Sequence, residues 1–194
     1  ENGETGALDY REKAPLLSSK TMYQDKNGNI KPNLSTVGAK AVGVPGTIAG
    51  IFEAHRTFGS MPKDSLLMPV IKLAEQGYVI TKNQKERLEY YAPIFDSVNG
   101  KTTLYSENLT DTVKNIALAK TLKRIATNGE SEFYTGETGQ KLVKFLSEKD
   151  GLITLEDLKA YAAEIFNADR PRYELLSAKS VNSSEKLPLH SHSL

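Results

Sequence analysis

The amino-acid sequence predicts an α+β fold in which helices predominate. One short strand, at about residues 7–11, runs into a cluster of charged residues. From position 45 onward, apolar residues recur at the three- and four-residue spacing of helices. Glycine and proline separate the helical stretches, as expected at helix ends. No repeat of about 20–50 residues is present, which argues against a solenoid.

The N-terminal strand lacks an obvious partner elsewhere in the sequence. Residues 1–6 are polar and glycine-rich, which is typical of a hairpin tip, and Ala7, Leu8 and Tyr10 then supply apolar strand residues. An unpaired strand edge exposes backbone hydrogen-bonding groups. We therefore expect this chain to be a piece of a larger protein.

The first predicted helix starts near Pro45, a residue that suits the first helical turn. Its apolar stripe consists of Ile48, Ile51, Phe52 and His55. Gly46 and Gly50 lie four residues apart and therefore on one face, where they would let another backbone approach closely. Gly59 is expected to end the helix in the left-handed conformation.

Further helices are predicted downstream, each with its own start or stop signal. Their expected ranges are 60–77, 81–93, 112–128, 138–149 and a last helix from Thr154 that carries Leu158, Tyr161 and Ile165. Pro69 predicts a kink or break near residues 65–68. Thr81 and Gln84 have the spacing of a capping box, and Pro93 is expected to end that helix. Residues 96–108 are predicted to form polar turns.

Composition excludes several classes of function. The formal net charge is +1 and no cysteine is present, so thiolate chemistry and cysteine-bound metal centres are excluded. The even scatter of charges argues against a nucleic-acid-binding surface. No apolar run approaches the roughly 20 residues that span a membrane, and no signal peptide is visible at the N-terminus.

Arg11 and Glu12 are the main candidate site residues. They stand at the end of the predicted strand beside Asp9 and Lys13, and such exposed charges are most often only solvated. A functional role would require an anionic partner, because a guanidinium offers a planar fork of donors that fits a carboxylate.

Seven motifs in register resemble the γ-glutamyltranspeptidase (glutathione hydrolase) family. They are DYREKAP (9–15), LST (34–36), GVPGTIAG (43–50), GSMP (59–62), PVIKLAEQG (69–77), EFYTG (132–136) and GLITLEDLKAY (151–161). The resemblance covers roughly residues 5–164. It implies a γ-glutamyltranspeptidase-like large-chain segment at 1–166, followed by a divergent, flexible tail at 167–194.

The resemblance implies a fold, a reaction and a role for the candidate residues. The fold is the layered αββα sandwich of N-terminal-nucleophile hydrolases, of which this segment supplies a strand and much of the helical cover. The reaction is transfer of a γ-glutamyl group from glutathione or a similar amide to water or an amino acid, with no cofactor. Arg11 matches the family arginine that holds the substrate α-carboxylate. Glu12 is expected to orient that arginine or the substrate amine, and Asp9 is expected to be structural.

The family nucleophile is absent from these residues. In the family, a threonine at the N-terminus of a small chain, produced by self-cleavage of the same precursor, attacks the γ-glutamyl amide. Nothing in the sequence resembles that segment, so no catalytic residue is assigned and the chain alone is expected to be inactive. Its partner would be the small chain. Family members are periplasmic or extracellular, and the same is expected for this protein.

Two alternatives stay open at the level of sequence. The chain could belong to a sibling with other substrates, such as a cephalosporin acylase or a poly-γ-glutamate depolymerase. It could also be a truncated, non-catalytic relative that acts as a helical interaction module.

The histidines do not indicate a catalytic or metal site. His55 lies on an apolar stripe, and His190 and His192 form a pair without a third metal ligand. The GVPG turn at 43–46 lacks the rest of a phosphate loop, and a packing role is favoured.

Overall fold

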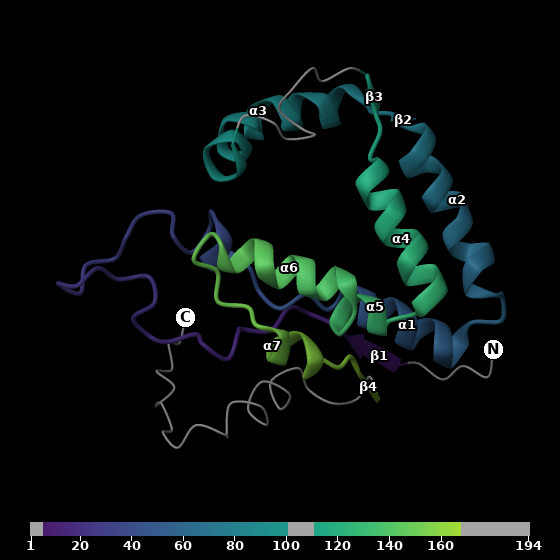
Figure 1. Ribbon diagram of the computed structural model, residues 1–194, viewed down its shortest axis with the longest axis horizontal. Coiled ribbons are helices and arrows are strands. Elements are labelled where there is room, and N and C mark those ends of the chain that lie inside the picture. The colour runs from purple at the N-terminus through teal and green to yellow at the C-terminus, as the bar shows by residue number, and fades with distance from the viewer. Residues whose placement is uncertain (1–5, 101–110, 168–194) are drawn as a thin grey trace, which may run out of the picture. The chain divides into compact units, whose positions relative to one another are not determined.

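A computed structural model describes residues 6–100 and 111–167 (Figure 1). The described part is α+β and mostly helical, as expected. The helices are α1 (Thr47–Phe58), α2 (Lys63–Gln76), α3 (Lys82–Asn99), α4 (Ile116–Asn128), α5 (Ser131–Tyr134), α6 (Glu137–Ser147), α7 (Leu155–Lys159) and the 3₁₀ helix η1 (Ala39–Ala41). The strands are β1 (Gly6–Asp9), β2 (Tyr78–Val79), β3 (Thr112–Val113) and β4 (Glu164–Asn167).

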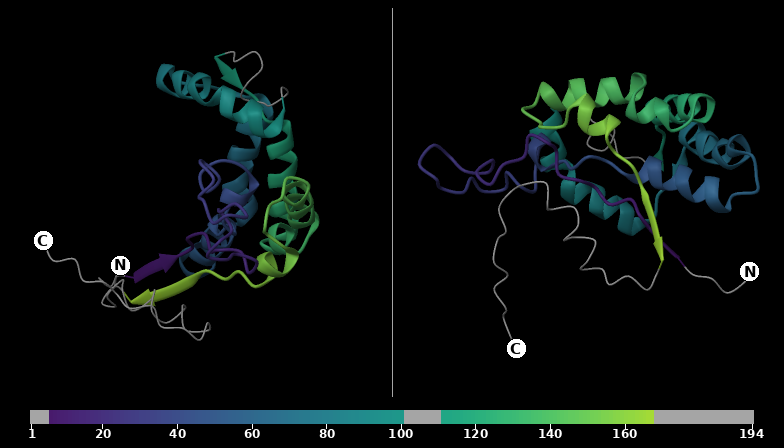
Figure 2. Two further views of the ribbon diagram at one scale, coloured as in Figure 1. Left: turned by 90° about the vertical axis from the view of Figure 1, so that its left-hand side faces the viewer. Right: turned by 90° about the horizontal axis from the view of Figure 1, so that it is seen from below.

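The chain divides into two compact units. Among the described residues, unit 1 combines residues 6–9 with residues 164–167, and unit 2 comprises residues 10–100 and 111–163. Within unit 1, β1 and β4 pair antiparallel, with Gly6 opposite Asn167 and Asp9 opposite Glu164 (Figure 2). The expectation that the first strand has no partner in this chain is therefore wrong. The partner was missed because β4 spans only four residues, too few for a period to be visible.

In unit 2, α2 and α4 lie side by side (Figure 1). Ile71 and Ala74 of α2 pack against Ala119 of α4, and all three are buried. The short β2–β3 ladder joins the same two helices at one end. Small residues at the contact allow the two helices to approach closely, and burying Ile71 contributes about 1.5–3 kcal/mol.

Two prolines lie inside helices. Of the kink or break expected near residues 65–68, the break is wrong, because α2 is continuous, whereas the kink stays a prediction. The helix end expected at Pro93 is also wrong. The α2 helix continues through Pro69, and α3 continues through Pro93 to Asn99. An internal proline removes one backbone hydrogen bond and costs about 3 kcal/mol. For α2, the packing of Ile71 on α4 offsets this cost, which a local pattern does not reveal. The capping box of Thr81 and Gln84 at the start of α3 is confirmed.

Other boundaries differ from expectation by a few residues. The helix expected from 112 begins at Ile116, because Thr112–Val113 forms β3 and Asn115 caps the helix. The last helix ends at Lys159, and Ile165 belongs to β4 instead. Gly59 ends α1 with a φ of −77°, so the left-handed stop expected there is wrong. The polar turns expected at 96–108 are wrong for residues 96–99, which belong to α3. Asn167, the first residue of the expected tail, belongs to β4. Residues 101–108 and the tail from 168 lie outside the described residues.

The main core of unit 2 gathers α1, α5, α6 and α7. Its buried members are Ala39, Val44, Ala49, Tyr134, Leu146, Ile153, Leu158 and Tyr161. On α1, the small residues Ala49 and Gly50 are buried, whereas Ile51 of the expected apolar stripe is exposed. The main core therefore contacts α1 through Ala49 and through the partly buried Ile48.

A buried carboxylate, Glu132, organises the turn between α5 and α6. It accepts hydrogen bonds from the Arg124 guanidinium (2.9 Å), the Thr138 hydroxyl (2.8 Å) and the Asn128 amide (3.2 Å). Its side chain is only 5% exposed. The hydrogen bond from Thr138 is the largest cause that lowers the pKa of Glu132 to about 2, and Arg124 and Asn128 assist, although burial opposes the shift.

The shifted pKa of Glu132 predicts a defined acid sensitivity. The folded-state pKa of about 2 lies below the ordinary value of 4.5. The ionised Glu132 carboxylate therefore stabilises the fold above pH 4.5, and this contribution is lost as the pH falls from 4.5 to about 2. Urea unfolding of the protein and of Glu132→Gln across this pH range measures the effect. The free-energy difference between them should shrink as the pH falls, and a constant difference would contradict the prediction.

Candidate functional site

The two candidate residues lie next to each other at the surface of unit 2. The Arg11 guanidinium donates to the Glu12 carboxylate at 2.9 Å, and the side chains are 79% and 55% exposed, respectively. An exposed ion pair of this kind contributes at most about 1 kcal/mol to folding. The pair therefore does little to stabilise the fold, and both charged groups face solvent.

The backbone that carries these side chains is held firmly on one side by the stretch that follows α7. The Tyr161 hydroxyl donates to the Arg11 carbonyl at 2.8 Å. The Lys13 ammonium donates to the Ala162 carbonyl at 3.3 Å and lies 4.8 Å from the centre of the Tyr161 ring. Tyr161 is buried, so this anchor lies within the core.

The Asp157 carboxylate of α7 also holds the segment that follows Arg11 and Glu12. Asp157 accepts a hydrogen bond from the Leu16 backbone N–H at 2.6 Å and also caps α7 through Thr154. Burial alone would raise the pKa of Asp157, but the hydrogen bonds from Thr154 and Leu16 outweigh it, so the pKa lies below its ordinary value. Asp157 thus stays ionised and keeps residue 16 tied to α7.

On the other side, the same segment lies against the approach to α1. Lys13 and Val44 exchange backbone hydrogen bonds of 3.2 and 2.8 Å. A Cβ added at Gly46 would stand 2.2 Å from the Tyr10 carbonyl, and one added at Gly50 would stand 2.3 Å from the Tyr10 ring. Gly46 and Gly50 thus allow the close approach expected from their spacing, and the GVPG turn serves packing.

Two tyrosines of the core link these attachments. The Tyr134 and Tyr161 rings stack with centres 5.7 Å apart and planes 8° apart. The Tyr134 hydroxyl donates to the Pro45 carbonyl at 2.9 Å and accepts from the Ala49 N–H at 3.1 Å. Burial raises the pKa of the Tyr134 phenol, which keeps its proton available for donation. One tyrosine therefore holds the start of α1, and its neighbour holds Arg11.

Sequence reasoning placed Arg11 and Glu12 together but missed both tyrosines. Tyr161 was expected on an apolar helix face and Tyr134 only as part of a motif, and aromatic residues at such positions usually only fill a core. The available signal was that the two tyrosines lie inside the EFYTG and GLITLEDLKAY motifs. Their contacts with Arg11 and Pro45 span 150 and 89 residues, and only a tertiary structure reveals them.

Other candidates add no second site. His55 of α1 is half-buried, and its Nε2 lies 2.8 Å from the Met61 carbonyl, as suits a boundary histidine. Asp9 is the last residue of β1, whereas His190 and His192 lie outside the described residues.

Among residues 6–100 and 111–167, no group of three His, Cys, Asp or Glu side chains could hold a metal ion. Within the same ranges, no helix is long and apolar enough to cross a membrane.

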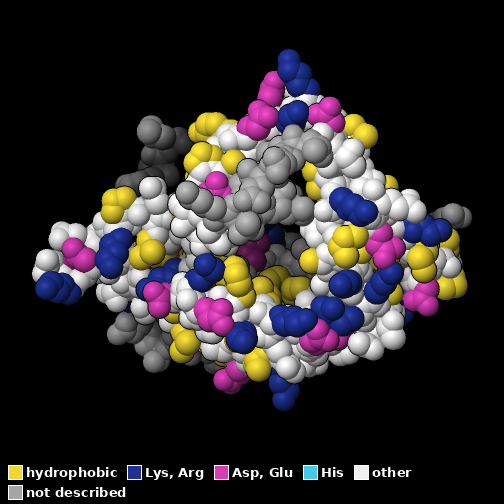
Figure 3. Space-filling view, turned by 45° about the horizontal axis from the view of Figure 1, so that its top comes forward, with side chains coloured by type: hydrophobic (Ala, Val, Ile, Leu, Met, Phe, Trp, Pro, Cys, Tyr) yellow, Lys and Arg dark blue, Asp and Glu magenta, His cyan; other side chains and the backbone are white. Residues whose placement is uncertain are grey.

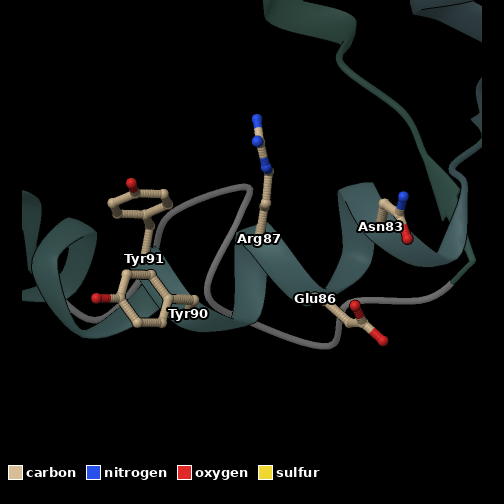
Figure 4. A pocket seen from close by; sticks show the side chains of 5 residues that line it. All are labelled: Asn83, Glu86, Arg87, Tyr90 and Tyr91. Atoms are coloured by element: carbon tan, nitrogen blue, oxygen red, sulfur yellow. The ribbon is translucent and has the colours of Figure 1, made fainter.

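An open hollow lies along α3, lined by Asn83, Glu86, Arg87, Tyr90 and Tyr91 (Figure 4). Arg87 and Tyr91 project from one side of the helix and Glu86 from the other. All five side chains are exposed, and the hollow has no buried polar group that would orient a ligand. It is therefore a surface feature rather than a second active site.

Charge is mixed over the surface. On the face drawn in Figure 3, Lys and Arg side chains are interspersed with Asp and Glu, in keeping with the formal net charge of +1. A nucleic-acid surface requires basic groups concentrated on one face. The expectation that the chain does not bind nucleic acid stays a prediction.

Comparison with known proteins relates the chain to one family. A family model described as Gamma-glutamyltranspeptidase matches residues 1–183. The glutathione hydrolase proenzyme of Pseudomonas aeruginosa is 43% identical over 164 residues, which cover 82% of this chain and 29% of that protein. The γ-glutamyltranspeptidase from Pseudomonas nitroreducens, solved in complex with L-DON, gives a TM-score of 0.79 at 40% identity, covering 86% of this chain and 50% of that one. The enzyme from Helicobacter pylori gives the same TM-score at 38% identity, covering 84% and 49%.

The family-model match includes the segment that holds Arg11 and Glu12, because it covers residues 1–183. The chain spans less than a third of the length of the curated relative and about half of the solved chains. The solved relatives have the N-terminal-nucleophile hydrolase fold, which agrees with the fold class expected from the sequence. The chain belongs to the γ-glutamyltranspeptidase family.

Proposed function

We propose that this chain is a large-chain segment of an enzyme that transfers the γ-glutamyl group of glutathione, or of a related amide, to water or an amino acid. The observation that carries the proposal is the presentation of Arg11. Its guanidinium is largely exposed, while its backbone carbonyl is hydrogen-bonded to a buried tyrosine. A cation displayed from a fixed backbone suits recognition of a small anion.

In this proposal, Arg11 binds the α-carboxylate of the γ-glutamyl donor. A guanidinium carries five N–H donors, so a contact with Glu12 is compatible with a bidentate contact to a second carboxylate. Glu12 has two roles open to it. It orients the guanidinium through the 2.9 Å contact, and its free carboxylate oxygen is a suitable acceptor for the α-ammonium of the donor.

The attacking group would come from a small chain of the same precursor. Its N-terminal threonine hydroxyl would attack the γ-glutamyl carbonyl, with its own α-amine as base. The residues described here would then contribute substrate binding and no nucleophile. No cofactor is required, and export to the periplasm or the cell exterior is proposed from family membership.

The choice among related substrates depends on residues outside this chain. A cephalosporin acylase or a poly-γ-glutamate depolymerase would use the same type of nucleophile but a different acceptor pocket. Arg11 would favour donors that carry a carboxylate, but it would not contact the acceptor. It therefore distinguishes these substrates only partly. We favour a γ-glutamyl donor with a free α-carboxylate.

A second function is supported by the surface of α3. This helix has no buried residue, and it exposes Tyr90, Tyr91 and Ile94. Exposed apolar groups on one helix can mark an interaction surface. A non-catalytic role as a helical interaction module is therefore the alternative, and it predicts that changing Arg11 has no functional effect.

The first prediction of the proposed function concerns the chain without the small chain. Residues 1–194 should not release aniline from a γ-glutamyl anilide, because no residue matches the family nucleophile. Absorbance of the released aniline measures the reaction, with a processed full-length relative as positive control. Release by the purified chain that Arg11→Ala abolishes would overturn the proposed division of labour.

The second prediction concerns Arg11 in the full-length processed protein. In the proposed enzyme–donor complex, the bound donor would cover the exposed Arg11 guanidinium and bury its pair with the α-carboxylate. Removing one member of a buried charged pair costs about 2–5 kcal/mol, so Arg11→Ala should lower kcat/KM by roughly 30-fold or more. Arg11→Lys should lower it less but measurably, because a lysine ammonium does not reproduce a bidentate fork. Steady-state kinetics on a γ-glutamyl donor gives both values.

Self-cleavage provides the internal control, since it uses the downstream threonine and no free γ-glutamyl carboxylate. Both Arg11 variants should be processed to two chains on a gel. If kcat/KM for Arg11→Ala stayed within about threefold of wild type, the loss of transition-state stabilisation would be smaller than the 1.4 kcal/mol that corresponds to a tenfold loss. That result would show that Arg11 does not hold the substrate.

A further inference from the structure

We propose that Tyr161 is a positioning residue for Arg11, acting through its hydroxyl on the Arg11 carbonyl. The inference rests on the proposed role of Arg11 in carboxylate binding and extends it to the core of unit 2. Tyr161 itself does not touch the substrate in this proposal. It sets the direction in which the Arg11 side chain leaves the backbone.

The Tyr161 hydroxyl is itself fixed in position. The ring is only 8% exposed, stacks on Tyr134 at 5.7 Å and has the Lys13 ammonium 4.8 Å from its centre. From this ring, the hydroxyl donates a 2.8 Å hydrogen bond to the Arg11 carbonyl. A hydroxyl whose ring is held by these contacts fixes the position of the peptide that accepts its hydrogen bond.

Gly46 provides the space for this hydrogen bond. A Cβ at this position would stand 1.9 Å from the Tyr161 hydroxyl oxygen and 2.2 Å from the Tyr10 carbonyl. Real Cβ atoms do not approach other atoms so closely. The φ of Gly46 is −111°, so the requirement for glycine here is spatial and does not come from backbone conformation.

The backbone matters because packing does little to orient the Arg11 side chain, which is 79% exposed. An exposed arginine samples many rotamers, and ordering them on binding is costly. The protein can reduce this cost by fixing the Arg11 peptide and by offering Glu12 as a neighbour at 2.9 Å. Loss of the Tyr161 hydroxyl should therefore weaken donor binding without removing any group that contacts the donor.

Two tyrosine variants test this in the full-length processed protein with a γ-glutamyl anilide as donor. Tyr161→Phe keeps the stacked ring and removes only the hydroxyl on Arg11. Tyr134→Phe makes the same change in the neighbouring ring, whose hydroxyl bonds to Pro45 and Ala49. We expect Tyr161→Phe to lower kcat/KM by about 5–10-fold, mainly through KM, and Tyr134→Phe to stay within about twofold.

The Arg11→Ala background separates positioning from a general structural effect. If Tyr161 acts through Arg11, adding Tyr161→Phe to Arg11→Ala should cause no further loss of kcat/KM. An equal loss in both backgrounds, or no loss in the wild-type background, would overturn the inference while leaving the role of Arg11 intact. No effect of Arg11→Ala would instead overturn the proposed function. If Tyr161→Phe does not fold, Gly46→Ala displaces the same hydroxyl together with the Tyr10 carbonyl. Its loss of kcat/KM should disappear in the Arg11→Ala background if the hydroxyl acts through Arg11, and an equal loss in that background would overturn the inference.

Discussion

The hydrogen bond from the Tyr161 hydroxyl to the Arg11 carbonyl joins residues 150 positions apart, and the rest of the site depends on it. It lies within a set of attachments that hold residues 10–16 between the start of α1 and the end of α7. Val44 binds this segment through the backbone on one side, and Asp157 binds it through a carboxylate on the other. Val44, Asp157 and Tyr161 are all buried, so the segment is fixed although its charged side chains are exposed.

In this arrangement, the Arg11 guanidinium is available to recognise an anion, and different residues hold the Arg11 backbone in place. The Arg11 guanidinium faces solvent, whereas the tyrosine stack that holds the Arg11 carbonyl belongs to the hydrophobic core. A substrate carboxylate would thus meet a cation whose backbone is already ordered, which lowers the entropic cost of binding. Under the proposed function, that carboxylate would be the α-carboxylate of a γ-glutamyl donor.

Local features of the fold could be predicted from the sequence, because they depend on neighbouring residues. The Thr81 capping box and the glycine stops at Gly77 and Gly129 are confirmed. Long-range features could not be predicted. Pairing of β1 with β4 and continuation of α2 through Pro69 both depend on partners elsewhere in the chain. Arg11 was found through a family motif, since its residue type alone would indicate only a solvated charge.

The central claim is that Arg11 contacts the α-carboxylate of the donor, and altering the substrate tests it most directly. In the full-length processed protein, kcat/KM is measured for a γ-glutamyl donor and for the same donor with its α-carboxylate replaced by a carboxamide. Wild type should prefer the carboxylate strongly, and Arg11→Ala should lose most of that preference, because contacting groups show a coupling energy in a double-mutant cycle. An unchanged preference in Arg11→Ala would contradict the account.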